Sequence, residues 1–283
     1  MAEENLPDTN GNTPNDIPSK SLPEFEIEPQ KTEPIEELSV TDAIAGVFTE
    51  PGDTFEGVKA SPKKNYWILP IIILIVISIT SAFLVTHDEE LYSQIKGKQT
   101  KAAKERFDEA VKSGKMTQEK ANEQMDQMDK GFNKSNPIFL VFTIAGPIVS
   151  TFIIFFFRGA VFFGVTKLFK GTAGFMSILS VLGLASIIDS IQTIIDTVLA
   201  IVMGKLQVNI GPVLLVNAES VGENMYKFLA HLDIFNFWFF AVIAIGLARV
   251  SNIKTTQMMP VVFGLWLLWV CITSFLKIPF MMG

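Results

Sequence analysis

The sequence predicts an all-α fold, a polytopic membrane bundle of about five transmembrane helices with a disordered N-terminal tail and an outer helical hairpin loop. Of the 283 residues, 49% are hydrophobic and 18% are charged, whereas a soluble globular domain usually has about 25% charged residues. Three long stretches carry no charge, namely residues 67–85, 136–157 and 255–276. Each is close to the roughly 20 residues that a helix needs to cross the hydrocarbon core of a bilayer.

The first 38 residues form an acidic tail. They contain ten acidic residues, two lysines and six prolines, and they account for the net charge of −6. A segment of low hydrophobicity and high net charge cannot bury enough apolar surface to offset the entropy lost on ordering, so we predict that residues 1–38 are disordered. We interpret this tail as a solubilising extension, with a docking segment for a partner as the alternative.

Residues 39–66 are expected to form an amphipathic segment on the cytoplasmic side. Ser39 to Asp42 is typical of a capping-box start, and Pro51-Gly52 is predicted to end the helix that follows. The apolar residues of this helix recur at helical spacing: Val40, Ala43, Ile44, Val47 and Phe48. Because the helix is too short to span a bilayer, we expect it to lie along the membrane surface or against the bundle.

The membrane domain is expected to cover residues 67–283. A basic pair, Lys63-Lys64, and two aromatic residues, Tyr66-Trp67, precede its first apolar stretch, which is typical of the cytoplasmic edge of a span. Five spans are predicted: residues 67–85, 139–165, a stretch within 175–203, 234–248 and 258–276.

The orientation of these spans follows from the lysine and arginine residues in the flanking segments. One side receives seven of them: Lys59, Lys63, Lys64, Lys167, Lys170, Arg249 and Lys254. The short segments of the other side hold three: Lys205, Lys227 and Lys277. The positive-inside rule therefore predicts a cytoplasmic N-terminus and an outer C-terminus. The loop of residues 86–135, with ten basic and ten acidic residues, is then outside.

That outer loop is predicted to form two short helices. Residues 101–112 are rich in helix formers, Ser113-Gly114 interrupts them, and Thr117 is a candidate N-cap for residues 118–128. We therefore expect a helical hairpin outside the membrane. Its mixed charges favour a solvated face over a binding site.

The sequence argues against several functional classes. No basic patch is present, so no nucleic-acid partner is expected. The single cysteine, Cys271, excludes a disulfide or a cysteine-based metal site within one chain. His87 and His231 lie near acidic residues at the outer ends of spans; a carboxylate–histidine metal site is conceivable there, but we interpret both as interfacial residues. Because no catalytic or phosphate-binding motif is found, we expect no enzymatic activity, no metal and no cofactor.

Three motifs resemble those of the Yip domain family (Ypt-interacting proteins). Residues 48–55, FTEPGDTF, are similar to its "F-x-x-P…F" opening, and residues 168–175, LFKGTAGF, resemble the glycine-bearing turn between its second and third spans. Residues 232–238, LDIFNFW, continuing to GLARVS at 246–251, resemble its "L-D-x-F-x-x-W…G-L" run into the fourth span. The resemblance covers about residues 40–276.

This resemblance implies a five-helix membrane domain with a cytoplasmic N-terminus. Eukaryotic relatives act in vesicle trafficking and interact with prenylated Rab-type GTPases, whereas bacterial relatives are numerous and mostly lack an assigned function. The family commonly has a proline early in its third span, but residues 183–189 here, GLASIID, have none. This departure and the large outer loop weaken the transfer of Rab binding. The loop is similar to that of bacterial members, so we expect a bacterial cytoplasmic membrane.

The third predicted span carries the most informative polar residues. Ser186, Asp189, Thr193 and Asp196 are spaced by three, four and three residues, which places them on one face of a helix. A carboxylate in hydrocarbon is costly and normally faces the bundle interior, water or a partner. The cluster therefore indicates either an ion or proton pathway, or a binding cavity, or a structural acid whose charge is satisfied. Asp196 could also already lie at the outer interface.

Arg158, in the second predicted span, is the candidate partner of Asp189. Counting about 1.5 Å per residue from the expected ends of the two spans brings these side chains within reach of each other. The alternative is that Arg158 extends its guanidinium to the cytoplasmic interface.

Two functional hypotheses follow from these observations. The favoured one is a non-enzymatic scaffold or adaptor in membrane organisation or trafficking. The alternative is a small transporter or channel component that uses the polar residues of the third span. The expected partners are the lipid bilayer and possible protein partners or a homo-oligomer. A hydrated cavity at the carboxylates would favour transport, and paired carboxylates would favour a scaffold.

Overall fold

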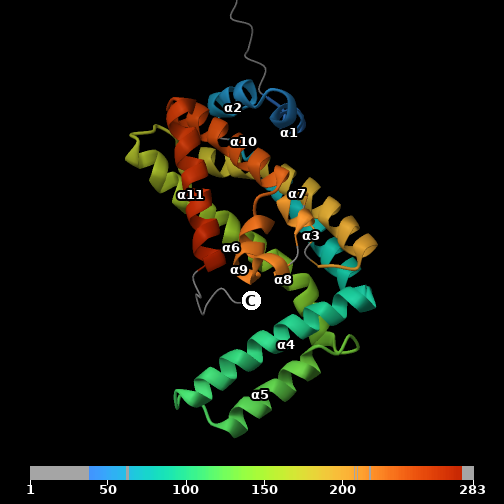
Figure 1. Ribbon diagram of the computed structural model, residues 1–283. Coiled ribbons are helices and arrows are strands. Elements are labelled where there is room, and N and C mark those ends of the chain that lie inside the picture. Colours follow the sequence, from blue (N-terminus) through green and yellow to red (C-terminus); the bar gives the residue numbers. More distant parts are fainter. Residues whose placement is uncertain (1–37, 62–63, 207, 209, 217, 276–283) are drawn as a thin grey trace, which may run out of the picture. The chain divides into compact units, whose positions relative to one another are not determined.

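The computed structural model describes residues 38–61, 64–206, 208, 210–216 and 218–275. Within these ranges the chain forms eleven α-helices and one 3-10 turn and contains no strand (Figure 1), so the predicted all-α class is confirmed. Apart from Leu38, the acidic tail lies outside the described residues, and its disorder stays a prediction.

Five helices are long and apolar enough to cross a membrane. A helix suits a segment surrounded by lipid because it satisfies most of its backbone hydrogen bonds internally. They are α3 (Ile68–His87), α6 (Pro137–Leu168), α7 (Phe175–Met203), α10 (Ile234–Ser251) and α11 (Thr255–Phe275). All five predicted spans are present, and the chain is an integral, multi-pass membrane protein.

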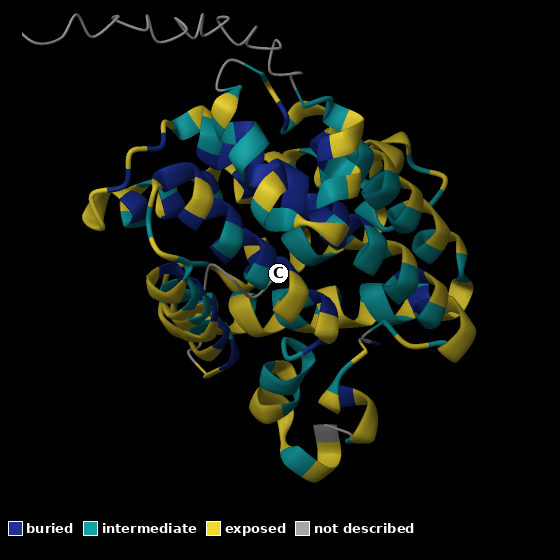
Figure 2. Ribbon diagram, turned by 90° about the horizontal axis from the view of Figure 1, so that it is seen from above, coloured by how far each residue is buried: buried dark blue, intermediate teal, exposed yellow. Residues whose placement is uncertain are grey.

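The helix α7 forms the centre of the bundle. In its most apolar window 67% of the residues are buried, against 6% in α6, so α6 presents most of its surface outward. The helix α3 runs parallel to α7, because Trp67 packs on Gly183 and the Ser81 hydroxyl lies 2.6 Å from that of Thr197. The buried residues, dark blue in Figure 2, gather in the interior of this group of helices.

The helix α10 runs antiparallel to α7. The connection before α7 meets the end of α10, where the Thr172 amide donates to the Ser251 carbonyl at 3.0 Å. At the other end, the Gln192 side chain donates to Asp233, the N-cap of α10. Thr172, just before α7, and Gln192, on α7, lie 20 residues apart in the chain, so the helices pack along nearly the whole length of α10.

Two helices precede the first span, where one was predicted. Ser39 caps α1 (Val40–Thr49) as expected, since its hydroxyl accepts from the Asp42 amide at 3.0 Å. The helix ends before Pro51, but a second helix, α2 (Pro51–Ala60), begins there. The prediction missed this helix because proline stops a helix from continuing yet is favoured in the first turn of the next one.

The pair α1–α2 packs against the bundle, which decides between the two predicted positions. Ala43, Val47 and Phe55 are fully buried in the same core as residues of α7 and α10. The Phe48 ring lies edge-on to Trp238 of α10, with centroids 5.4 Å apart.

The loop after α3 forms the expected helical hairpin. Its first helix, α4 (Glu89–Lys112), begins twelve residues earlier than predicted because Asp88 caps it by accepting from the Leu91 amide at 2.9 Å. Thr117 caps α5 (Gln118–Gly131), as predicted. The two helices lie side by side (Figure 1), with Lys96 and Asp129 3.1 Å apart between them. Short helical segments connect α7 to α10: η1 (Pro212–Leu215), α8 (Ala218–Val221) and α9 (Glu223–Ala230).

Candidate functional site

The predicted polar face of α7 separates into hydroxyls that are satisfied within the helix and carboxylates that reach other groups. The Ser186 hydroxyl donates to the Gly183 carbonyl at 2.6 Å, and the Thr193 hydroxyl donates to the Asp189 carbonyl at 2.7 Å. Bonds of this kind let a hydroxyl lie inside a span without an external partner. Besides Thr197, whose hydroxyl meets that of Ser81 on α3, the polar groups of this face that remain for contacts between helices are those of Asp189, Gln192 and Asp196.

Asp189 forms an ion pair with Arg158. The Nη1 atom of Arg158 lies 3.3 Å from Oδ2 of Asp189 and joins α6 to α7. Both side chains are partly enclosed, with 37% of Arg158 and 23% of Asp189 exposed. Two positions were predicted for Arg158, an ion pair with Asp189 or a guanidinium at the cytoplasmic interface, and the structure shows the ion pair. The guanidinium also lies 5.0 Å from the ring centroid of Phe239, a cation–π contact with α10.

A glycine brings α6 close enough for this pair to form. A Cβ atom on Gly159, the residue after Arg158, would lie 2.7 Å from Cδ2 of Leu179 on α7. Small residues permit such close approach of helices in membranes.

A second polar contact, which the sequence analysis missed, joins α7 to α10. Asp233 is 1% exposed and caps α10, because it accepts from the Asn236 amide at 2.9 Å and from the Asn236 side chain. The Gln192 side-chain amide donates to the same carboxylate at 3.3 Å. The position of Gln192, three residues after Asp189 on the polar face, indicated that its side chain could bond to another helix. The sequence does not show that this helix is α10.

Asp196 is the least satisfied member of the cluster. Its Oδ1 atom is buried and has no hydrogen-bond partner among the described residues. Asp189 and Asp196 both interact electrostatically with Asp233, whereas the Arg158 guanidinium pairs with Asp189. This charge balance favours a cation, a proton or water beside Asp196, because an unpaired buried carboxylate oxygen is costly.

A cavity of about 360 Å³ adjoins these groups. The candidate residues Arg158, Ser186, Asp189, Thr193 and Asp196 all line it. Its remaining wall combines hydroxyl and amide groups with apolar side chains of four helices, namely Ser150, Thr151, Gln192 and Asn236, and Ile71, Leu74, Ile154, Phe155, Leu182 and Phe239. The cavity is large enough for several water molecules or a small ligand.

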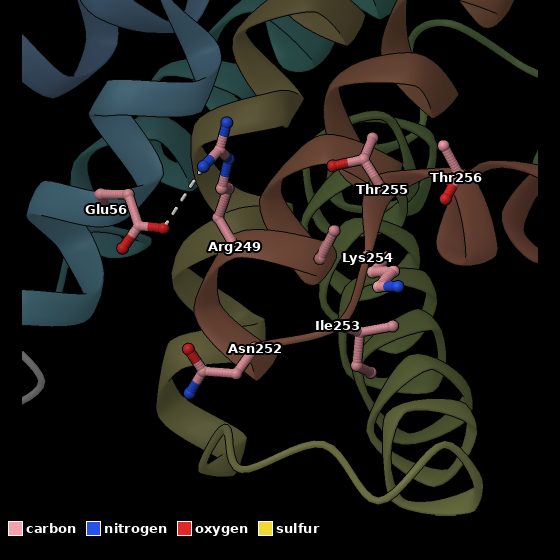
Figure 3. Close-up of a pocket in the computed structure, with 8 residues that line it drawn as sticks. Glu56, Arg249, Asn252, Ile253, Lys254, Thr255 and Thr256 are labelled. Carbon is pink, nitrogen blue, oxygen red and sulfur yellow. Dashed lines mark ion pairs between the residues drawn. The ribbon is translucent and has the colours of Figure 1, made fainter.

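A different polar cavity, of about 400 Å³, lies between α2 and the connection from α10 to α11. Figure 3 shows Arg249 at the end of α10 reaching Glu56 on α2, with 3.6 Å between Nη1 and Oε1. Lys59 pairs with the same glutamate at 3.1 Å, and Lys254 and Thr256 complete the edge of the cavity. Charged side chains from two separate parts of the chain thus meet at one surface.

In the described part of the chain, no group of three or more histidine, cysteine or acidic side chains is placed to hold a metal ion. The Nδ1 atom of His87 lies 2.9 Å from the Phe83 carbonyl. His231 follows α9, and burial lowers its pKa while the nearby Asp233 carboxylate opposes that shift.

Comparison with known proteins gives one match. The family described as the Yip1 domain matches residues 45–276, a range that begins in α1 and includes all the described residues from there to the end of α11. No curated protein and no solved structure matches the chain.

Proposed function

The chain belongs to the Yip1 domain family, and from that premise we propose that it is a non-enzymatic membrane scaffold or adaptor in membrane organisation or trafficking. The observation that carries this proposal is the surface where α2 meets the connection from α10 to α11. It presents Glu56, Arg249 and Lys254 together, and the helices behind it are anchored in the core through Phe55. A rigid, charged surface beside a membrane suits a protein partner, since charge complementarity gives specificity.

We place this surface on the cytoplasmic side, in a bacterial cytoplasmic membrane. Lys59, Lys64, Lys167, Lys170, Arg249 and Lys254 all flank the spans there, and the positive-inside rule assigns such flanks to the cytoplasm. The partner is then a cytoplasmic protein or a second copy of this chain.

Site-specific photocrosslinking in cells tests the proposal that this surface binds a protein partner. A photoreactive residue at Thr256 should give a discrete adduct of constant mass, and the substitution Arg249→Glu should abolish that adduct because it reverses the charge of the surface. A photoreactive residue at Gln118, on the hairpin, is the matched control. The absence of any adduct at Thr256, or the same adduct from both positions, would contradict the proposal.

The alternative, a small transporter or channel component, is favoured by the cavity beside Asp196. Its partnerless Oδ1 atom and the surrounding hydroxyl and amide groups could hold a cation or a proton. Proteoliposomes loaded with a pH-sensitive dye decide between the two functions. Proton or cation flux that disappears in Asp196→Asn would establish transport and displace the scaffold, whereas flux equal to that of protein-free vesicles supports the scaffold.

A further inference from the structure

A cavity of about 400 Å³ lies between the end of α3 and the start of α6. Its wall has two chemically different halves. Phe83, Leu140 and Phe139 provide the apolar half, and His87, Lys134 and Asn136 provide the polar half. It is separate from the polar cluster of α7 and from the surface around Glu56.

The two halves match the two regions of a bilayer. The apolar helix α3 ends at His87, and α6 begins at Pro137, so the cavity lies where two neighbouring spans leave the hydrocarbon. Phe83 and Leu140 are exposed on the spans themselves, whereas Lys134 precedes α6. An occupant must therefore be apolar at one end and charged at the other.

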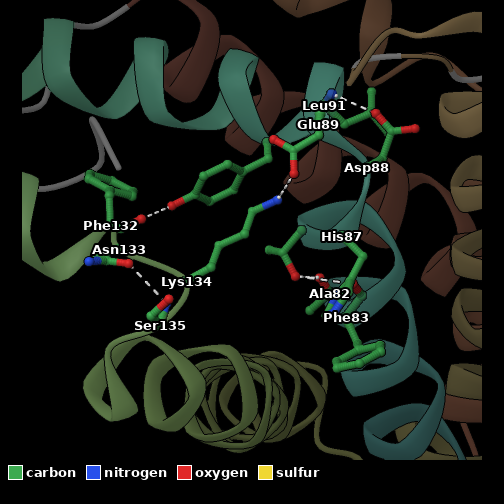
Figure 4. Close-up of polar contacts among 12 residues, drawn as sticks. Ala82, Phe83, His87, Asp88, Glu89, Leu91, Phe132, Asn133, Lys134 and Ser135 are labelled. Atoms are coloured by element: carbon green, nitrogen blue, oxygen red, sulfur yellow. Dashed lines mark hydrogen bonds and ion pairs between the residues drawn. The ribbon is translucent and has the colours of Figure 1, made fainter.

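In the polar half, Lys134 pairs with Glu89, a residue of α4 that does not itself line the cavity (Figure 4). The Nζ atom of Lys134 lies 2.8 Å from Oε1 of Glu89, at the start of α4. It also lies 4.4 Å from the ring centroid of Tyr92, and the Tyr92 hydroxyl donates to the Phe132 carbonyl. An ammonium group has three donors, and among the described residues Lys134 donates to one acceptor, Glu89. This leaves donors of Lys134 that can bind an anion entering the cavity.

We propose that this cavity binds a phospholipid whose phosphate is held by Lys134. Its acyl chain lies along Phe83 and Leu140. Its headgroup ammonium lies against Glu89, whose side chain is largely exposed, so the site selects an amine-bearing phospholipid over an anionic one. This inference is independent of whether the protein acts as a scaffold or a transporter.

Lipid retention measured by native mass spectrometry tests the phosphate contact. The full chain is reconstituted in nanodiscs of equal parts phosphatidylethanolamine and phosphatidylglycerol and is then released. Lys134→Gln should retain about tenfold less lipid, because a charge-assisted hydrogen bond is lost, and Lys134→Arg should restore retention. Lys115→Gln, between α4 and α5, is the matched control and should behave like the unmodified protein. Equal retention by Lys134→Gln and Lys115→Gln would overturn the proposal.

The same experiment tests the nature of the ligand. Glu89→Gln should lower the ratio of retained phosphatidylethanolamine to phosphatidylglycerol, because it removes the group that binds the ammonium. An unchanged ratio would overturn the headgroup assignment. Inorganic phosphate should not displace the bound lipid; displacement would identify a site for free phosphate and contradict a lipid site.

Discussion

At the scale of single residues, two polar side-chain contacts join neighbouring helices of the bundle. Arg158 on α6 forms an ion pair with Asp189 on α7, and Gln192 on α7 donates a hydrogen bond to Asp233 at the start of α10. Each bond satisfies a group that would otherwise be costly in a medium without water. Asp196 is the exception, because its Oδ1 atom has no hydrogen-bond partner in the described part of the chain. It is therefore the residue of this cluster that is best placed to bind a ligand or a proton.

Arg158 and Asp189 are expected to show a large coupling energy in a double-mutant cycle. Arg158→Leu and Asp189→Leu should each lower the free energy of unfolding by up to about 3–5 kcal/mol, because each leaves an uncompensated charge, and the double variant should recover much of that loss. Thermal unfolding in detergent measures the three variants. The exposed pair Lys96–Asp129 is the control, where single changes should cost no more than about 1 kcal/mol. Additive losses at Arg158 and Asp189 would show that the pair is not energetically coupled.

His231 should make the stability of the protein sensitive to acid. Burial lowers the pKa of His231 below its ordinary value of 6.5, and the Asp233 carboxylate only partly offsets this. As the pH falls, His231 therefore takes up a proton in the unfolded chain before it does so in the folded protein. The contribution of neutral His231 to stability is complete above its unfolded pKa and is lost below that value. The melting temperature should fall between about pH 7.5 and pH 5.5, and His231→Gln should reduce that fall.

If the melting temperature of His231→Gln fell with pH as much as that of the unmodified protein, His231 would not be the source of the acid sensitivity.

At the scale of helices, the close contact between α3 and α7 depends on one glycine. A Cβ atom on Gly183 would lie 2.4 Å from Cα and 2.5 Å from Cβ of Trp67, and a backbone atom cannot move aside as a flexible side chain can. Gly183→Ala should therefore destabilise the protein by about 1–3 kcal/mol or more.

Gly164 on α6 gives a matched control, because a Cβ atom there would meet nothing within 4 Å. Gly164→Ala should be neutral or slightly stabilising, since alanine favours a helix more than glycine does. Thermal unfolding of both variants in one detergent makes the comparison. Equal stabilities would show that α3 and α7 do not approach closely at Trp67.

The five long helices could be predicted because each is a charge-poor apolar run of the length that a bilayer requires. The helix α2 could not, since Pro51 fits both the end of one helix and the first turn of the next. The first half of α4 was missed because residues 89–100 are polar and include Gly97, although Asp88 followed by two glutamates was a usable N-terminal signal. The residue pattern predicted which face of α7 is polar. It could not predict that Gln192 bonds to Asp233, because local sequence does not identify neighbouring helices.

At the scale of the whole described chain, the two extramembrane parts are attached differently. The pair α1–α2 shares the core of the bundle through Phe55 and Val47. The hairpin of α4 and α5 has its own small contacts, with Leu91 and Ala121 buried outside the main core. This difference fits a scaffold in which the membrane helices hold the α1–α2 surface, whereas the hairpin is joined to them near its start, where Gln94 donates to the Gly204 carbonyl at the end of α7.

The most direct test of the account is the sidedness of its connections. Single cysteines are placed in a Cys271→Ser background at exposed positions of four segments: Asp53, Ser113, Glu219 and Lys254. An impermeant thiol reagent should label the variants at Asp53 and Lys254 from one side of the membrane and those at Ser113 and Glu219 from the other, with Asp53 on the cytoplasmic side. Labelling of Asp53 and Ser113 from the same side, or of Glu219 and Lys254 from the same side, would contradict a five-span protein.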